Sequence, residues 1–281
     1  MENRICIVTG ATDGIGRQTA LGLAQRQARV VIVGRDAGKG EAVARELTAA
    51  TGNTRIEYES ADLSSLAEVH ALAARLSGRH AHIDVLINNA GGYFADRRET
   101  VDGLEYSFAF NHLSYALLTT LLLDRLRAAE AARIVNVASR VHRGVTLDFA
   151  DLQMTARYDG WLAYRRSKLM NVLYTYALAR RLAGSGVTAN VLHPGFVRSR
   201  FGHNNAGLRG LGMKLAQRLA AISLEAGAAT SLHVATEPSL AGVTGRYFAK
   251  SREVASSPQS HDEAAQERLW QETEALLTQH G

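Results

Sequence analysis

Residues 4–16, RICIVTGATDGIG, carry an apolar run that ends in a glycine-rich turn and leads into a helical pattern. Glycine permits a tight turn and lets the backbone approach a ligand where a side chain would block it. The helix expected to begin at Ile15 points its N-terminus at this turn, and a helix N-terminus favours a pyrophosphate. We therefore predict a strand, a phosphate-binding turn and a helix, with a plain turn as the alternative.

The alternation of short apolar runs and longer helical periods continues along the chain. Strands are expected at 4–10, 28–34, 54–60, 83–91, 132–139, 186–195 and 244–249, and helices at 15–27, 38–50, 65–76, 103–129, 160–183, 223–236 and 261–277. Such alternation implies a parallel sheet, and near-continuous apolar strands indicate that helices cover both faces. We predict an α/β, Rossmann-type doubly wound parallel sheet of about seven strands in a single domain, residues 1–281.

Residues 196–222 are the least regular part of the chain and follow the sixth expected strand. Ligands of doubly wound sheets bind beyond the carboxyl ends of the strands. This insertion is therefore a candidate lid over a substrate. Several side chains near the expected cleft could line an apolar pocket or simply pack the lid: Tyr93, Phe94, His142, Phe196 and Phe201.

Composition excludes several classes of function. The 281 residues include 32 Lys and Arg against 27 Asp and Glu, and the basic residues are scattered, so we expect no nucleic-acid partner. The single cysteine, Cys6, allows no internal disulfide and is expected to be a small buried hydrophobe. We see no secretory signal and no apolar run long enough for a transmembrane anchor, so a cytoplasmic protein is expected.

Other chemistry is disfavoured by spacing. His142, His193 and His203 are dispersed, and no carboxylate pattern accompanies them, so we expect no metal site. The Gly-x-Ser-x-Gly pattern of a hydrolase nucleophile does not occur around Ser139.

The end of the second expected strand bears on the cofactor. In dinucleotide folds an acid there takes the ribose hydroxyls, whereas an arginine accommodates a 2′-phosphate. This chain has Gly34 at that position and Arg35 after it, with Arg17 near enough to help. Asp36 could contact the ribose but is a better candidate for the cap of the next helix. We therefore predict NADP(H) over NAD(H).

Further motifs follow the glycine turn in a fixed order. The turn itself reads Thr-Gly-x-x-x-Gly-x-Gly, and the later motifs are Asp62-Leu63, Asn88-Asn89-Ala90-Gly91, Asn111, Ser139, Tyr164-x-x-x-Lys168 and Pro194-Gly195. Across about residues 4–250 this set resembles the short-chain dehydrogenase/reductase family. The stretches SKLMNVLYTYALARRL and HPGFVRSRF are similar to its retinol dehydrogenase and protochlorophyllide reductase-like branch.

The resemblance implies a catalytic set of Asn111, Ser139, Tyr164 and Lys168. Tyr164 would exchange a proton with the substrate oxygen, and Ser139 would hydrogen-bond that oxygen. A free tyrosine has a pKa of about 10, which a nearby ammonium such as that of Lys168 would lower. Asn111 would complete a water-linked proton relay to Lys168.

The cofactor-binding residues follow from the glycine turn, the second strand and the resemblance together. They are Thr9, Gly10, Gly14, Ile15, Gly16, Arg17, Arg35, Asp62, Leu63, Asn89, Ala90, Gly91, Tyr164, Lys168, Pro194 and Gly195.

The sequence thus predicts an NADP(H)-dependent oxidoreductase that interconverts an apolar aldehyde or ketone and its alcohol. A non-catalytic NADP(H)-binding sensor on the same fold is the alternative, although a sensor has no need of Ser139, Tyr164 and Lys168. A sugar-nucleotide epimerase is disfavoured by the glycine spacing. The resemblance also implies a possible homo-oligomer. Arg165 and Arg166 could face solvent, meet another subunit or bring charge to the cleft.

Overall fold

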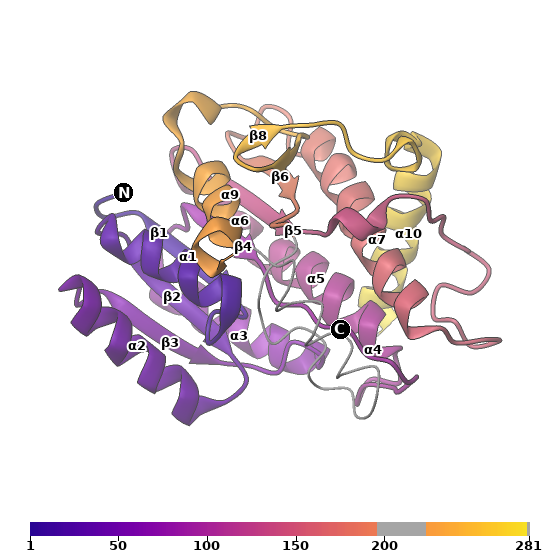
Figure 1. Ribbon diagram of the computed structural model, residues 1–281, viewed down its shortest axis with the longest axis horizontal. Helices are drawn as coiled ribbons and strands as arrows, with labels where there is room; N and C mark the ends of the chain where they lie inside the picture. The colour runs from indigo at the N-terminus through magenta and orange to yellow at the C-terminus, as the bar shows by residue number, and fades with distance from the viewer. Residues whose placement is uncertain (196–222, 280–281) are drawn as a thin grey trace.

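The computed structural model describes residues 1–195 and 223–279, and its strands form one sheet in the order β3-β2-β1-β4-β5-β6-β7-β8 (Figure 1). The strands are β1 (Ile5–Thr9), β2 (Arg29–Gly34), β3 (Ile56–Ser60), β4 (Val85–Asn88), β5 (Arg133–Val137), β6 (Thr188–Leu192), β7 (Tyr247–Ala249) and β8 (Arg252–Glu253). The first seven run parallel, and β8 pairs antiparallel with β7. The predicted doubly wound sheet is confirmed, with one short strand that the sequence did not reveal.

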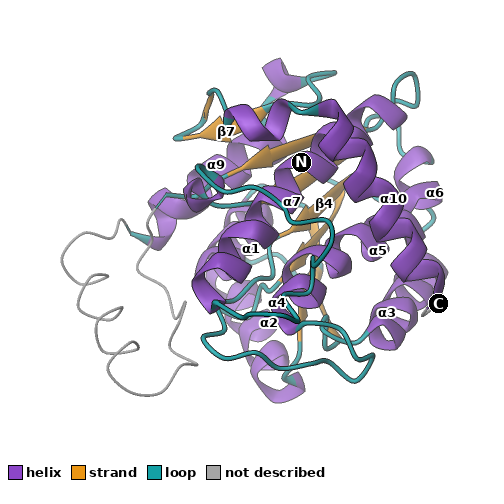
Figure 2. Cartoon of the chain, turned by 90° about the vertical axis from the view of Figure 1, so that its right-hand side faces the viewer, coloured by secondary structure: helices purple, strands orange, loops and turns teal. Residues whose placement is uncertain are grey.

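Helices cover both faces of this sheet (Figure 2). On one face, α1 (Gly14–Gln25), α2 (Ala37–Thr51) and α9 (Leu224–Thr236) bury one apolar cluster. On the other, α3 (Leu66–Arg79), α5 (Ser114–Leu121), α7 (Gly160–Arg181) and α10 (Glu263–Gln279) bury a larger one. The chain order reverses between β1 and β4, which is where ligands of such sheets bind.

Side-chain caps set where several helices begin. Asp13 accepts a hydrogen bond from the Gly14 amide at the start of α1, and Asp36 accepts one from the Lys39 amide at the start of α2. Ser65 caps α3 in the same way. Each side-chain oxygen satisfies a backbone N–H that the first turn of a helix leaves without a partner. Asp36 therefore has the capping role that the sequence favoured for it.

The long helical region expected over about 103–129 is found, but it is divided into several elements. The chain forms α4 (Tyr106–Phe108), a π-helical turn η1 (Ala109–Leu113), α5 and α6 (Leu123–Arg127). Within η1, the Asn111 carbonyl accepts a hydrogen bond from the Asn171 side chain of α7. A π-turn widens a helix by one residue, often at a functional site. The contact that satisfies the Asn111 carbonyl is a tertiary one, which local helical periodicity does not reveal.

The predicted lid, residues 196–222 with Phe196, Phe201 and His203, lies outside the described residues. Among the helices of 1–195 and 223–279, none combines the length and apolarity needed to cross a bilayer.

A chain of buried amides and hydroxyls ties α7 to the middle of the sheet. Asn88 Nδ2 donates to Asn136 Oδ1 at 2.9 Å and to Thr119 Oγ1 at 3.0 Å. Asn136 Nδ2 in turn donates to Thr175 Oγ1 at 2.9 Å. Buried polar groups are costly unless they are paired, so these contacts specify how α5 and α7 lie on β4 and β5.

We predict that Asn136→Ala lowers the free energy of unfolding by about 2 kcal/mol, because the buried Asn88 amide and Thr175 hydroxyl each lose one hydrogen bond. Urea unfolding measures this loss. The double variant with Asn88→Ala should lose less than the sum of the two single losses. A neutral Asn136→Ala would contradict the role given to this chain of contacts.

Candidate active site

The glycine turn meets the segment after β4 at the carboxyl edge of the sheet. Gly10 has a φ of +64°, and a Cβ there would lie 2.8 Å from the Ala90 Cα. A Cβ on Gly16 would overlap the Gly10 carbonyl oxygen and the Asn89 side chain. The turn therefore leaves bare backbone at the N-terminus of α1, which is the cradle that a pyrophosphate requires.

Thr9 and Asn89 lock this turn in place. The Thr9 hydroxyl accepts hydrogen bonds from the Asn89 and Ala90 amides at 2.9 and 3.0 Å. The Asn89 side chain donates to the Thr9 carbonyl at 2.8 Å. These two predicted cofactor residues are hydrogen-bonded to each other. Their bonds fix the backbone against which a dinucleotide would bind.

Charged side chains gather at the end of β2. The side chain of Arg35 is 70% exposed, and its Nη1 lies 3.5 Å from Asp62 Oδ2. Burial opposes ionisation of the Asp62 carboxyl, but hydrogen bonds from Ser64 and the Arg35 guanidinium hold its pKa below the usual value. Gly34 packs against Thr12, with only 2.5 Å from a built Cβ to the Thr12 Cγ2. An acid at Gly34 would therefore require the Thr12 side chain to move.

Two further cations border this region and are already paired. Arg17 Nη2 lies 2.8 Å from Glu46 Oε2. Lys39 Nζ lies 2.8 Å from Asp13 Oδ2, a contact that sequence reasoning missed. Of the two predicted arginines, Arg35 is the more exposed and has the longer ion pair.

Lys168 is buried beneath Tyr164, and its ammonium group donates to the Val137 carbonyl at 3.0 Å. The Tyr115 and Tyr164 rings lie 5.5 and 5.9 Å from its Nζ. A Cβ on Gly91 would lie only 3.1 Å from Nζ, so the backbone after β4 closes over the lysine. Burial lowers the pKa of Lys168 to about 7.

Tyr164 lies beside Ser139, as the resemblance implied. Burial raises the pKa of Tyr164 to about 12, and a hydrogen bond with the Ser139 side chain acts in the opposite direction. The expected lowering by Lys168 is not found, because the same burial that penalises the phenolate also disfavours the ammonium. Tyr164 is therefore protonated at neutral pH, the state that a proton donor to a carbonyl needs.

Asn111 joins the segment after β4 to α7. Its Oδ1 accepts from the Gly92 amide at 2.8 Å, and its Nδ2 donates to the Gly92 carbonyl at 2.9 Å and to Ser167 Oγ at 3.1 Å. A Cβ on Gly91 would lie 3.1 Å from Lys168 Nζ and 3.3 Å from Asn111 Oδ1, so both groups lie beside that glycine. The water-linked relay between them stays a prediction.

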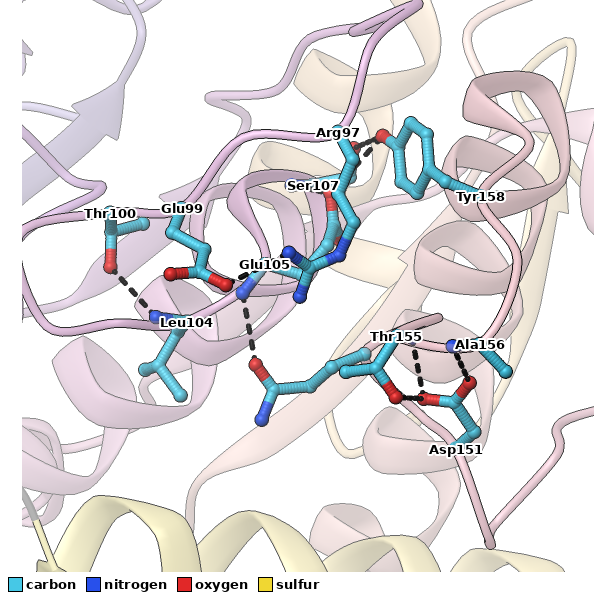
Figure 3. Close-up of polar contacts among 11 residues, drawn as sticks. Arg97, Glu99, Thr100, Leu104, Glu105, Ser107, Asp151, Thr155, Ala156 and Tyr158 are labelled. Carbon is cyan, nitrogen blue, oxygen red and sulfur yellow. Dashed lines mark hydrogen bonds and ion pairs between the residues drawn. The ribbon is translucent and has the colours of Figure 1, made fainter.

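The loops after β4 and β5 are joined by polar contacts (Figure 3). The Tyr158 hydroxyl donates to Glu105 Oε1 at 3.2 Å and lies 3.3 Å from Ser107 Oγ. Asp151 accepts from the Thr155 and Ala156 amides within its own loop. These contacts hold the two loops that flank the site in one arrangement.

The remaining predicted residues lie at the same edge. Ile15 is in the first turn of α1, and Leu63 is buried in the segment after β3. Pro194 and Gly195 follow β6, where the Gly195 amide donates to His193 Nδ1 at 3.1 Å. Within residues 1–195 and 223–279, no three His, Cys, Asp or Glu side chains gather in a way that could hold a metal ion.

A family model described as short chain dehydrogenase matches residues 4–207. The chain belongs to the short-chain dehydrogenase/reductase family. Retinol dehydrogenase 13 from Homo sapiens is 40% identical, over 99% of this chain and 85% of that protein. Retinol dehydrogenase 12 from Homo sapiens is 39% identical, over 99% of this chain and 87% of that protein.

A crystal structure of a protein from Mycobacterium Paratuberculosis has a TM-score of 0.79 and 32% identity, and the alignment covers 99% of this chain and 94% of that one. These similarities confirm the family and its retinol dehydrogenase-like branch. The protein is therefore an oxidoreductase of the carbonyl/alcohol type.

Several residues that organise the site were not found from the sequence. These are Ser167 and Asn171, which hold Asn111. His142, which the sequence placed near the cleft, is buried and accepts the Ser257 amide through Nε2 at 3.1 Å. Asn171 gave one signal, since it lies one helical turn after Lys168 in an apolar helix.

We predict that Lys168→Met makes the cofactor-free protein more stable at pH 7, by more than about 1 kcal/mol. Burial depresses the pKa of the folded lysine from 10.5 to about 7. Between these values the unfolded chain holds a proton that the folded chain releases, so the stability of the parent rises with pH across this window. The advantage of the variant should therefore shrink toward pH 10.

Chemical unfolding at several pH values measures this effect. Lys39→Met serves as a matched control, because that lysine is partly exposed and paired with Asp13. A Lys168→Met protein that is less stable than the parent at pH 7 would show that the Val137 hydrogen bond outweighs the cost of burial.

Proposed function

We propose that this protein is an NADP(H)-dependent reductase and dehydrogenase that interconverts an apolar aldehyde or ketone and its alcohol. The observation that carries the proposal is the placement of Tyr164, which is buried, bonded to Ser139 and adjacent to the buried Lys168. A bound nicotinamide supplies the hydride, and the chain's own residues orient the carbonyl and deliver the proton.

Each residue has a definite task in the reduction direction. Ser139 hydrogen-bonds the carbonyl oxygen and polarises it. Tyr164 transfers its phenolic proton to that oxygen. Its pKa, raised to about 12, keeps the phenol protonated at neutral pH, and the alkoxide that hydride addition creates is a stronger base than the phenolate. Lys168, whose pKa is lowered to about 7, can return a proton to Tyr164 near neutral pH.

Aromatic side chains beside Tyr164 support an apolar substrate. Trp161 is 41% exposed and stacks on the Tyr164 ring at 5.8 Å between centroids. Tyr93 meets both rings edge-on, at 5.9 Å from Trp161 and 6.4 Å from Tyr164. Flat apolar groups pack well against such rings. The similarity to proteins named retinol dehydrogenase makes a retinoid the first substrate to test.

The choice of NADP(H) over NAD(H) is supported by the end of β2. Gly34 has no side chain to contact the ribose hydroxyls, and the exposed guanidinium of Arg35 follows it. A planar, always charged guanidinium suits a phosphate. The cytoplasmic location, the possible homo-oligomer and the lid over residues 196–222 remain predictions from the sequence.

The alternative is an NADP(H)-binding sensor without catalysis. A broad panel of carbonyl compounds can be screened by measuring the loss of NADPH absorbance. Tight NADPH binding with no turnover of any compound would favour that alternative.

We predict that Tyr164→Phe lowers kcat by about 100-fold or more and leaves NADPH binding nearly intact, because only the proton donor is removed. Steady-state kinetics and fluorescence titration with NADPH measure the two effects. Tyr174→Phe is a matched control on the same helix, where the ring stacks on Trp270 instead. Full activity of Tyr164→Phe would refute the proposed mechanism.

We predict that Arg35→Ala raises KM for NADPH by about tenfold or more and changes KM for NADH little, because only NADPH carries the 2′-phosphate. Arg17→Ala should have a smaller effect, since that guanidinium is paired with Glu46. Equal shifts in KM for the two cofactors would overturn the assignment.

A further inference from the structure

Arg165 and Arg166, next to the catalytic tyrosine, both donate to backbone carbonyls of one loop. We call residues 139–146 the Ser139 turn, because Ser139 begins it. Arg165 Nε donates to the Val141 carbonyl at 3.1 Å, and Nη2 donates to the Arg143 and Gly144 carbonyls at 2.9 and 3.3 Å. Arg166 Nε donates to the Thr146 carbonyl at 3.2 Å, farther along the turn from Ser139.

We infer that Arg165 is a positioning residue that holds the Ser139 hydroxyl at a fixed place relative to the Tyr164 hydroxyl. This inference rests on the proposed function, in which Ser139 and Tyr164 act on the same substrate oxygen.

The first link is the peptide geometry of the turn. The Val141 amide donates to Ser139 Oγ at 3.5 Å, while the carbonyl of the same residue accepts from Arg165. The His142 amide donates to the Ser139 carbonyl at 3.2 Å. Arg165 thus binds the carbonyl of Val141, the residue whose N–H orients the Ser139 side chain.

The opposite side of the turn is held by the C-terminal segment. The His142 ring accepts from the Ser257 amide through Nε2, so its Nδ1 carries the proton and donates to the Ser139 carbonyl at 2.7 Å. Arg143 donates to the Ala255 carbonyl. Arg165 holds the side of the turn that faces α7, the helix that carries Tyr164, through the Val141, Arg143 and Gly144 carbonyls.

The guanidinium of Arg165 directs its hydrogen bonds to the backbone of the Ser139 turn. Among the ion pairs of residues 1–195 and 223–279, none involves Arg165. Three carbonyls of one turn instead take its donors, which matches the fixed fork of a guanidinium. It therefore acts as a clamp on backbone rather than as a charge offered to the cleft.

The clamp has a chemical consequence. The hydrogen bond from Ser139 lowers the pKa of Tyr164 against the effect of burial. Loosening the Ser139 turn would weaken this bond and raise the pKa of Tyr164 further. Alcohol oxidation needs the phenolate, so its rise with pH would move to higher pH. A residue with only a structural role would not move that profile.

The test compares Arg165→Ala with Arg166→Ala, a matched control from the same helix. Arg165→Ala should lower kcat for carbonyl reduction by about tenfold, leave NADPH affinity unchanged and shift the oxidation profile to higher pH. Guanidinium ion at millimolar concentration should restore part of the activity of Arg165→Ala. Arg166→Ala should show none of these effects.

A double-mutant cycle shows whether Arg165 acts through Ser139. In a Ser139→Ala background, Arg165→Ala should have little further effect on kcat. Full additivity would overturn the inference, as would parental kinetics of Arg165→Ala or an equal loss in Arg166→Ala. If Arg165→Ala does not fold, Arg165→Lys, which keeps the charge with fewer donors, should show the same changes at smaller size.

Amide hydrogen exchange separates this inference from the proposed function. Exchange over residues 139–146 should be faster in Arg165→Ala than in the parent or Arg166→Ala. A parent protein that reduces no carbonyl would refute the proposed function, and faster exchange in Arg165→Ala would still support the clamp. Unchanged exchange would overturn the clamp whatever the activity of the parent.

Discussion

The burial of Lys168 against the end of β5 is the constraint on which the site depends. An ammonium group taken out of water is costly unless its surroundings compensate it, and here its hydrogen bond goes to the Val137 carbonyl. That bond fixes α7 against the strand that leads directly to Ser139. Tyr164, one helical turn before Lys168, is thereby brought beside Ser139. The buried lysine thus lowers the stability of the fold, but it lies where the proposed proton transfer requires it.

The other parts of the site are positioned around Lys168 by polar side chains. These side chains form hydrogen bonds with backbone groups of the neighbouring loops. Asn111 bonds both the N–H and the C=O of Gly92, and Asn89 holds the glycine turn through the Thr9 carbonyl. The segment after β4 is therefore fixed on both sides, toward the cofactor cradle and toward Lys168. Rigid placement of reacting groups is the main contribution that a protein makes to a cofactor's chemistry.

The sequence predicted those features that local patterns determine. The alternation of strands and helices, the glycine turn and the Tyr164-x-x-x-Lys168 spacing are all set within a few residues, and all are found in the structure. The π-turn at Asn111 was not predicted, because its carbonyl is bonded by a side chain of α7 that lies far away in the sequence. The pKa of Tyr164 was predicted in the wrong direction, because spacing gives the nearby charge but not the burial. Arg165 and Arg166 could not be assigned until the turn they bind was placed.

The most direct test of the account is the transfer of a label. The protein is incubated with an apolar aldehyde and NADPH that carries deuterium on the transferable face of the nicotinamide C4, and the alcohol is analysed by mass spectrometry. The account predicts one deuterium per alcohol from the parent protein and essentially no alcohol from Tyr164→Phe. The account would be contradicted if NADPH bound but no aldehyde or ketone gave labelled alcohol, or if Tyr164→Phe formed as much labelled alcohol as the parent.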